Sequence, residues 1–524
     1  MTEEITAHNS EIKETDSSSR RMTVKVMKGS FWVLMGQVLP LIATFVASPF
    51  VIRSLGSESY GVLILVGLIS GYFSFADFGM VMASTRFGAE AYASGLPEQE
   101  GRVIRTAAMI GVSSSLFIAV PMFLFSRWIV GDLLNVPAHL QQQASIALKI
   151  TAVAFVMSFV GNIFNTPQLS RLRMDLNVLI NAGFKILMTL TTPIVLYLGG
   201  GIVEATIVAF FAAFLIMTGN VLVSGKLLPS LYATTIDRKK IAPLMKFGSN
   251  LVLYSIGLLI TNNLEKLLLT RYVSVKSLAY YSIAFTFAGM TTLFSMAMVQ
   301  TLLPAFSQLL SPDKREQLKS LFTRCVRIGL IGLIPSVMVL LIIAKPFFTI
   351  WAGREFGIES VFPFYILLAG VFFSLMVYIP NTILLSSGKS NLFARFYLLE
   401  IIPYATLTYF LINWLGIIGA AMAWSIRETV NAFTFISFTK KYTGLTIDFS
   451  HHLYGIAAGF LVFLPAALVA FLHDNFSVWV FVLLPVCLAA YFFVTWKKLI
   501  NPGEREWAQS QFNKIFRRKN TTVV

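Results

Sequence analysis

The sequence is short of charged residues. Asp, Glu, Lys and Arg make up 13% of its 524 residues, whereas soluble domains carry about 25%. Hydrophobic residues reach 56%, and the mean hydropathy is +0.74. A soluble core cannot absorb so much apolar surface, so most of the chain is expected to lie in lipid. The composition therefore excludes an ordinary soluble domain and indicates a membrane protein.

The motifs of soluble enzymes are also absent. The sequence has no G-x-x-x-x-G-K-[ST] loop, so the protein is not expected to be an ATPase itself. It has no H-E-x-x-H motif and no Cys/His cluster, and the His451-His452 pair reads as surface. We therefore predict no catalytic residue, no metal ligand and no cofactor.

The sequence contains two cysteines, and its N-terminus does not resemble a signal peptide. Cys325 and Cys487 fall in or beside apolar segments, which predicts two buried thiols and no disulfide. The polar N-terminus lacks an apolar core, so residues 1–22 read as a disordered cytoplasmic tail.

Long continuous apolar runs are what the sequence does contain. Because they do not alternate with polar residues, they favour helices over a closed barrel. The fold class predicted is an all-α integral membrane protein with about fourteen transmembrane helices. The predicted ranges are 28–53, 60–83, 104–126, 143–165, 177–198, 201–225, 246–268, 277–303, 323–350, 358–384, 393–415, 416–438, 453–472 and 476–496.

Two of these boundaries depend on glycine. We place a break at Gly199-Gly200-Gly201 and another near Gly416, because merging either pair of helices would give a segment too long to span a membrane.

The positive charges are unevenly distributed over the predicted connections. With the N-terminus inside, 31 Lys and Arg residues fall on the cytoplasmic side and 6 on the outside. This asymmetry predicts cytoplasmic termini and accounts for most of the net charge of +16, so nucleic acid is not an expected partner. The basic C-terminal tail could add attraction to anionic membrane lipids.

A faint internal repeat divides the chain. Lys28 and Arg53 flank the first helix as Lys246 and Arg271 flank the seventh, although basic residues at helix ends can match by chance. Six helices separate the copies, which predicts two parallel halves. The expected parts are the tail 1–22, a six-helix bundle 23–225, a cytoplasmic linker 226–245, a second bundle 246–438, two additional helices in 453–496 and a basic tail 497–524.

Eight ionisable residues fall inside predicted helices, where each is costly unless it faces protein or water. One interpretation is a polar cavity, with Lys149, Lys185, Lys266 and Arg427 binding an anionic substrate and with Asp77, Glu265, Glu400 and Glu428 coupling to an ion. The alternative is a set of ion pairs that fix helix packing. Neighbouring residues on a helix do not face each other, so Arg427 and Glu428 are each expected to find a partner on another helix.

Asp77 and two arginines belong to the first predicted hairpin, whose first helix contains two prolines. Asp77 is either a protonatable carboxylate or the cap of a helix that restarts after it. Arg53 and Arg86 are expected to act at the gate or the membrane interface.

The hairpin carries a recognisable pattern. G-S-F-W, then P-F-V-I-R-S-L-G-S-E-S-Y-G, then F-A-D-F-G-M resembles the polysaccharide transporter family of bacterial membrane proteins, in the superfamily that also holds the multidrug and toxin extrusion exporters. The motifs lie in residues 28–90, and the second half of the chain is matched by architecture alone.

The resemblance implies a flippase of the cytoplasmic membrane that moves polyprenyl-pyrophosphate-linked oligosaccharide to the outer leaflet by alternating access, coupled to an ion gradient. A polysaccharide polymerase and glycosyltransferases would be its partners in cell-surface polysaccharide synthesis. The intramembrane charges balance, four against four, which leaves a neutral or zwitterionic glycan open. Two alternatives remain: a cation-coupled drug exporter of the same superfamily, and a membrane glycan polymerase or ligase.

Overall fold

The computed structural model describes the backbone of residues 2–73, 79–233, 235–292, 302, 306–307, 309–310, 312–447, 449–472, 478–498 and 505. These residues form helices and connections, without a strand. The chain divides into two compact units, Met1–Ala279 and Tyr280–Val524, and each is described by itself.

Within the described residues, nine helices are long and apolar enough to cross a membrane. They lie in Trp32–Tyr72, Pro97–Leu124, Ala138–Ser170, Met174–Tyr197, Ile202–Leu227, Arg315–Ala352, Val361–Ser386, Arg395–Leu415 and Trp479–Lys497. The all-α membrane fold predicted from the sequence is confirmed, while the number of fourteen helices stays a prediction.

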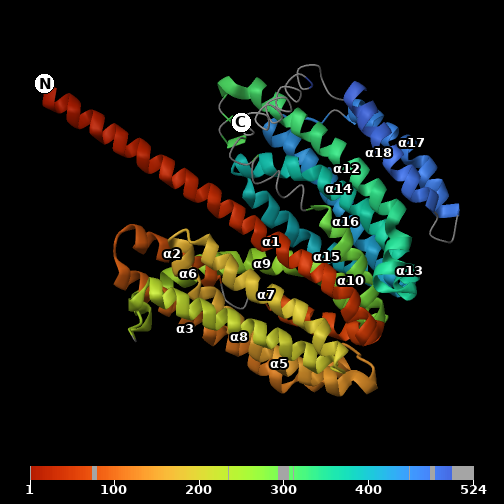
Figure 1. Cartoon of the computed structure of the whole chain (residues 1–524), viewed down its shortest axis with the longest axis horizontal. Coiled ribbons are helices and arrows are strands. Elements are labelled where there is room, and N and C mark those ends of the chain that lie inside the picture. Colours follow the sequence, from red (N-terminus) through yellow and green to blue (C-terminus); the bar gives the residue numbers. More distant parts are fainter. Residues whose placement is uncertain are drawn as a thin grey trace, which may run out of the picture. The chain divides into compact units, whose positions relative to one another are not determined.

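The first unit is built from long helices joined by short ones (Figure 1). Helix α5 packs against α3 and α8, and α7 packs against α1 and α8. In chain order the elements are α1 (Thr2–Tyr72), α2 (Met80–Ala93), α3 (Pro97–Leu124), α4 (Ser126–Trp128), η2 (Ile129–Leu133), α5 (Ala138–Phe164), α6 (Thr166–Ser170), α7 (Met174–Tyr197), α8 (Ile202–Leu227), η3 (Pro229–Tyr232) and α9 (Arg238–Tyr272).

Helix α1 contains a sharp break at Gly56, whose φ of 75° and ψ of 166° are not helical. Only glycine adopts such a conformation without strain. The break falls in the turn predicted between the first two membrane segments, so α1 consists of two helices that meet at Gly56. Residues 2–22, predicted as a disordered tail, lie in the first part of α1.

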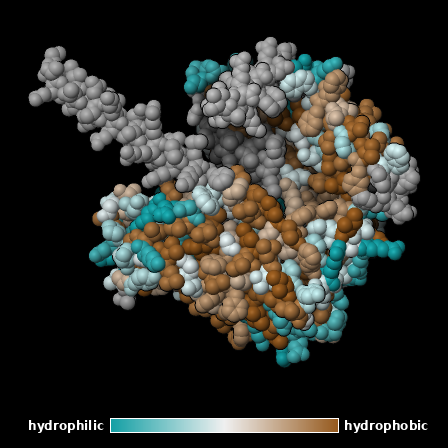
Figure 2. Space-filling model, in the orientation of Figure 1, coloured by the Kyte–Doolittle hydropathy of each residue, from teal (hydrophilic) through white to brown (hydrophobic). Residues whose placement is uncertain are grey.

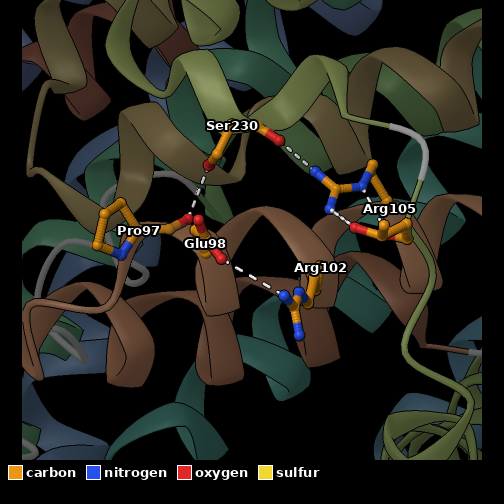
Figure 3. A network of polar contacts seen from close by, with 6 residues as sticks. Pro97, Glu98, Arg102, Arg105 and Ser230 are labelled. Atoms are coloured by element: carbon orange, nitrogen blue, oxygen red, sulfur yellow. Dashed lines mark hydrogen bonds and ion pairs between the residues drawn. The ribbon is translucent and has the colours of Figure 1, made fainter.

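The connection between α8 and α9 is held on the start of α3 by polar contacts (Figure 3). Arg105 donates from Nε to the Thr235 carbonyl at 2.9 Å and from a terminal nitrogen to the Ser230 carbonyl. The Ser230 hydroxyl donates to the Pro97 carbonyl at 2.8 Å, and the Asp237 amide donates to the Thr106 hydroxyl at 3.1 Å. The predicted linker 226–245 therefore includes a segment fixed to the first unit.

The second unit begins inside α10 (Val275–Met290). In it α14 packs closely against α16, α15 against α16, and α12 against α14 and α17. The remaining elements are η4 (Pro312–Lys314), α12 (Arg315–Ala352), α13 (Arg354–Glu359), α14 (Val361–Ser386), α15 (Ser390–Leu415), α16 (Ile417–Thr443), α17 (Phe449–Leu472) and α18 (Val478–Lys498).

Both glycine boundaries are confirmed. Helix α7 ends at Tyr197 and α8 begins at Ile202, with Gly199 at φ 95° between them. Helix α15 ends at Leu415 and α16 begins at Ile417, with Gly416 at φ 59°. The positive φ stops each helix and lets the chain reverse. Cys325 and Cys487 are free and buried, as predicted.

The face of the first unit formed by α7 and α8 is apolar. Figure 2 shows hydrophobic residues spread over α7 and α8, with hydrophilic residues towards the ends of these helices. Leu179 is 66% exposed, Ile194 60% and Phe211 49%. Exposed apolar side chains of this number are expected where lipid replaces water as the solvent.

Candidate functional site

The tight hairpin of α15 and α16 positions a buried group of charged side chains in the second unit. Gly419 sits so close to the Leu411 carbonyl that a Cβ there would collide with it. This approach brings the two antiparallel helices together from the turn at Gly416 onwards. Glu400 on α15 and Arg427 on α16 can then meet well away from the turn.

Helices α14 and α16 approach each other through small residues. A Cβ on Gly370 would lie 2.7 Å from the Ser425 Cα, and the Ser425 hydroxyl donates to the Ile366 carbonyl at 2.8 Å. Glycine here permits nearly direct backbone contact, as is common between helices in lipid. This contact fixes the part of α16 that carries Arg427.

The charged group consists of one base and two acids. Arg427 Nε donates to Glu400 Oε1 at 2.9 Å, and Arg427 Nη1 lies 3.7 Å from Glu428 Oε1. The side chains of Arg427, Glu400 and Glu428 are 5%, 10% and 13% exposed, so all three are largely removed from solvent. Low exposure strengthens the attraction, but it also makes an unpaired charge expensive.

Aromatic and amide groups complete this cluster. The Arg427 guanidinium lies 5.1 Å from the centroid of the Tyr404 ring, within the range of a cation–π contact. The Asn431 side chain lies near Glu400, and its buried Oδ1 has no partner within the described part of the chain. A buried amide oxygen without a partner is an acceptor available to a proton donor or a cation.

With both acids ionised, the cluster of Arg427, Glu400 and Glu428 carries one more negative charge than positive. Taking up one proton, or binding one cation, would neutralise it. The arrangement therefore has the chemistry of a site that can exist in two charge states. The structure thus joins three of the predicted site residues across α15 and α16.

A second group of predicted residues lies on α9 in the first unit. Lys266 is 8% exposed and donates from Nζ to Asn263 Oδ1 at 2.9 Å, while the neighbouring Glu265 is fully buried. The Tyr72 hydroxyl donates to the Asn263 carbonyl, which ties the end of α1 to α9. Lys266 and Glu265 thus lie beside the polar contact, through Asn263, that connects these two helices.

The other predicted bases are separate from one another. Lys149 is half-buried on α5, with Nζ 5.5 Å from the centroid of the Phe123 ring. Lys185 is exposed on α7, Arg53 is exposed on α1, and Arg86 on α2 is exposed with its guanidinium 5.4 Å from the Phe87 ring. Asp77 lies outside the described residues.

Sequence reasoning missed a buried ion pair in the first unit. Arg171, after α6, binds Glu100 of α3 through two hydrogen bonds of 2.7 and 3.1 Å, and the Glu100 side chain is fully buried. The Arg171 guanidinium also lies 4.4 Å from the Tyr92 ring. Both charged residues fall in predicted connections, and the sequence of a connection does not indicate which of its side chains are buried.

It also missed a chain of buried amides near that pair. Gln168 Nε2 donates to Asn220 Oδ1 at 3.0 Å and to the Ser224 hydroxyl at 3.3 Å. Asn220 Nδ2 donates in turn to Asn181 Oδ1 at 3.1 Å. This chain links α6, α7 and α8, which suits the role of polar side chains as contacts between helices in lipid.

Comparisons with curated proteins give relatives of similar length. The chain is 23% identical over 421 residues to the "Putative O-antigen transporter" of Shigella flexneri, covering 78% of this chain and 96% of the relative. It is also 23% identical over 421 residues to the "Probable low-salt glycan biosynthesis flippase Agl15" of Haloferax volcanii, covering 78% and 82%.

Solved structures share the fold. "Lipid II flippase MurJ, inward closed conformation" matches with a TM-score of 0.67 at 14% identity, covering 91% of this chain and 100% of that one. The inward-facing conformation of a multidrug resistance MATE family transporter of the MOP superfamily matches with a TM-score of 0.64 at 11% identity, covering 78% and 94%.

The model of one protein family, described as polysaccharide biosynthesis protein, matches residues 26–310. The match covers more than half of the chain and includes the hairpin whose motifs gave the resemblance. The predicted relationship is thereby confirmed: the chain belongs to the polysaccharide biosynthesis protein family, and its fold is that of the MOP superfamily.

Proposed function

We propose that this protein is a flippase for a lipid-linked oligosaccharide. Its substrate would be a sugar chain on polyprenyl pyrophosphate, moved from the cytoplasmic to the outer leaflet for the synthesis of a cell-surface polysaccharide. The family match over residues 26–310 carries this proposal, and relatives named as an O-antigen transporter and a glycan flippase support it. The protein would act without catalysis in the cytoplasmic membrane, with both termini inside.

The predicted basic residues are proposed to bind the pyrophosphate and sugars. Lys185 is exposed on α7 and has no ion pair with a residue that the structure describes, which leaves its ammonium open to an anion. Lys149 and Lys266 are more enclosed, and Arg427 is occupied by Glu400. Lys185 is therefore the first residue to test, and Arg427 would bind substrate only after its pair opens.

The test is export of surface polysaccharide in a strain that depends on this chain. Lys185→Gln should reduce export at an unchanged level of the protein in the membrane. Lys226→Gln serves as control because Lys226 is an exposed lysine at the end of α8. Normal export by Lys185→Gln would remove this residue from substrate binding. Drug efflux without glycan export would favour the exporter alternative, and glycan polymerisation by the purified protein would favour the enzyme.

We propose that movement is coupled to an ion gradient through carboxylates. Glu400 and Glu428 share one arginine, and the resulting excess of one acid supports a role in taking up a proton or a cation. Asp77, in the F-A-D-F-G-M motif of the first hairpin, is the other candidate, with Glu265 on α9 as an enclosed third.

Transport in proteoliposomes, with and without an imposed proton or sodium gradient, separates these carboxylates. Asp77→Asn imitates the protonated acid and should allow transport that no longer responds to the gradient, whereas Asp77→Glu should retain a response. A wild-type response of Asp77→Asn would assign the residue to a helix cap. Glu400→Gln and Glu428→Gln would then be the variants expected to lose coupling.

A further inference from the structure

Four exposed basic residues gather at one end of the second unit, and we call them the basic cluster: Arg315, Lys389, Lys440 and Lys441. They come from three elements. Arg315 begins α12, Lys389 lies between α14 and α15, and Lys440 and Lys441 lie in the last turn of α16. Parallel α14 and α16 end together here, so charges far apart in the sequence meet.

Tyr442 shows how closely the charges approach. The ammonium groups of Lys389 and Lys441 each lie 5.6 Å from the centroid of its ring, so they are within about 11 Å of each other. Two residues further on, a Cβ at Gly444 would be 2.6 Å from Arg315 Nη2. None of the four has an acidic partner among the residues that the structure describes. Like charges at this separation repel, and an anion between them would remove the repulsion.

An apolar pocket opens near the basic cluster. Its walls come from one face of α12, from α14 and from the segment after α16, through Val326, Gly329, Leu330, Leu333, Leu375, Met376, Tyr378, Ile379 and Ile447. Ile447 follows Gly444 by three residues, which an extended chain spans in at most about 11 Å. On α12, Val326 lies eleven residues from Arg315, a rise of about 16 Å. Along α12 the pocket thus begins about three helical turns from Arg315, deeper in the membrane than the charges.

We propose that the basic cluster and this pocket together bind an anionic phospholipid. Its phosphate would lie among Arg315, Lys389 and Lys441, and one of its acyl chains would lie against the apolar walls of the pocket. Charge complementarity selects an anionic headgroup, since basic residues near the membrane surface attract anionic lipids. The apolar walls favour a lipid over a free phosphate ion, because a free phosphate has no apolar group that could contact them.

The first test measures lipid retention by the purified full-length protein in native mass spectrometry. The probes are dioleoylphosphatidylglycerol and dioleoylphosphatidylcholine, which share acyl chains and differ in headgroup charge. Wild type should prefer the anionic lipid. Lys389→Gln with Lys441→Gln should weaken its binding by about fivefold for each charge removed, whereas Lys389→Arg with Lys441→Arg should preserve it.

The matched control is Lys226→Gln with Lys497→Gln, which removes two exposed lysines elsewhere, one of them also over an aromatic ring. Equal loss of the anionic lipid in this control and in the cluster variant would overturn the site. So would equal retention of the two lipids by wild type.

The pocket is tested separately with Gly329→Leu. A Cβ at Gly329 would meet only Ile379 Cδ1, at 3.5 Å, so the larger side chain can enter the pocket without displacing backbone. It should weaken binding of dioleoylphosphatidylglycerol, whereas Gly67→Leu, at an exposed glycine of the first unit, should not. Equally tight binding of lipid-free glycerophosphoglycerol by wild type would overturn the role of the acyl chain.

Discussion

Arg427 combines a buried position with several partners. Glu400 accepts its hydrogen bond, Tyr404 lies against the guanidinium, and Glu428 approaches from the same helix. Removing a charge from such a group leaves its partner desolvated and unpaired, which costs more than the pair itself contributes. The stability of the second unit should therefore fall when one charge of this group is removed alone, and should fall much less when the base and its acids are removed together.

This predicts a specific pattern of stabilities. Arg427→Gln should destabilise the protein by about 3–5 kcal/mol, because it leaves Glu400 buried without its base. Arg427→Leu combined with Glu400→Leu and Glu428→Leu leaves no charge of the group unpaired and should recover most of that loss. Thermal unfolding in detergent measures both, with Lys185→Gln as an exposed control expected to stay within about 0.5 kcal/mol of wild type. A triple variant as unstable as the single one would refute the matched-charge explanation.

The sequence indicates which residues belong to this cluster better than it indicates how they pair. Arg427, Glu400 and Glu428 can be recognised in the sequence because they are charged residues inside apolar segments. The expectation that Arg427 pairs with a residue on another helix is confirmed by Glu400. Glu428 instead contacts its own neighbour, because the long side chains bend towards each other. Pairing depends on the rotation of α15 against α16, which no single-helix pattern specifies.

At the scale of the helices, the contact of α14 with α16 depends on one missing side chain. Gly370→Leu should be destabilising by about 1–3 kcal/mol, because its Cβ would press on the backbone of Ser425. Gly329→Ala is the control: it adds a methyl group at ordinary contact distance and should be neutral or slightly stabilising. Thermal unfolding of the two variants compares them, and equal melting temperatures would contradict the close approach.

The segment between α8 and α9 should be released by Arg105→Ala. Arg105 donates to the Ser230 and Thr235 carbonyls and to the Thr235 hydroxyl, so its loss removes the contacts that it makes with this segment in Figure 3. Hydrogen–deuterium exchange of the amides in 228–237 should become faster. Arg102→Ala, which breaks only the exposed pair with Glu98, should leave these amides as slow as in wild type. Unchanged exchange in Arg105→Ala would show that the segment is held by other contacts.

Helix boundaries were predictable where glycine sets them. Gly199 and Gly416 both take positive φ at the predicted breaks, since glycine has no Cβ to oppose it. Docking of the connection between α8 and α9 was not predictable, because it depends on one arginine about two turns into α3 and on main-chain carbonyls. In the sequence, a connection that is fixed by such contacts cannot be distinguished from a connection that is not.

For the whole molecule, composition and length were enough to predict the class of fold. Nine apolar spans within the described chain and a TM-score of 0.67 to a MurJ structure agree with it. Periodicity cannot predict how the helices assemble, because lipid-facing and protein-facing sides are both apolar in these segments. The motifs of the first hairpin supplied the family, which composition could not.

Orientation in the membrane is predicted from the distribution of basic residues and can be tested with single cysteines. Ser94→Cys, in a basic connection, should be shielded from an impermeant thiol reagent in intact cells, and Leu198→Cys should react. Leu198 is 79% exposed, which makes it a better probe than Ser57 in another predicted outer turn, at 9%. The native cysteines are buried and should give little background. Labelling of Ser94→Cys from outside would contradict cytoplasmic termini.

The pairing of Glu400 with Arg427 also bears on how the chain is made. The span on α15 is the least apolar of the nine in the described chain, and it contains Arg395 and Glu400. A charge at the centre of a lone helix opposes membrane insertion by roughly 2.5–3.5 kcal/mol. We expect α15 to leave the translocon together with α16, as a hairpin already closed at Gly416. If ribosomes are stalled before Arg427 emerges, α15 should therefore be only partly inserted into the membrane.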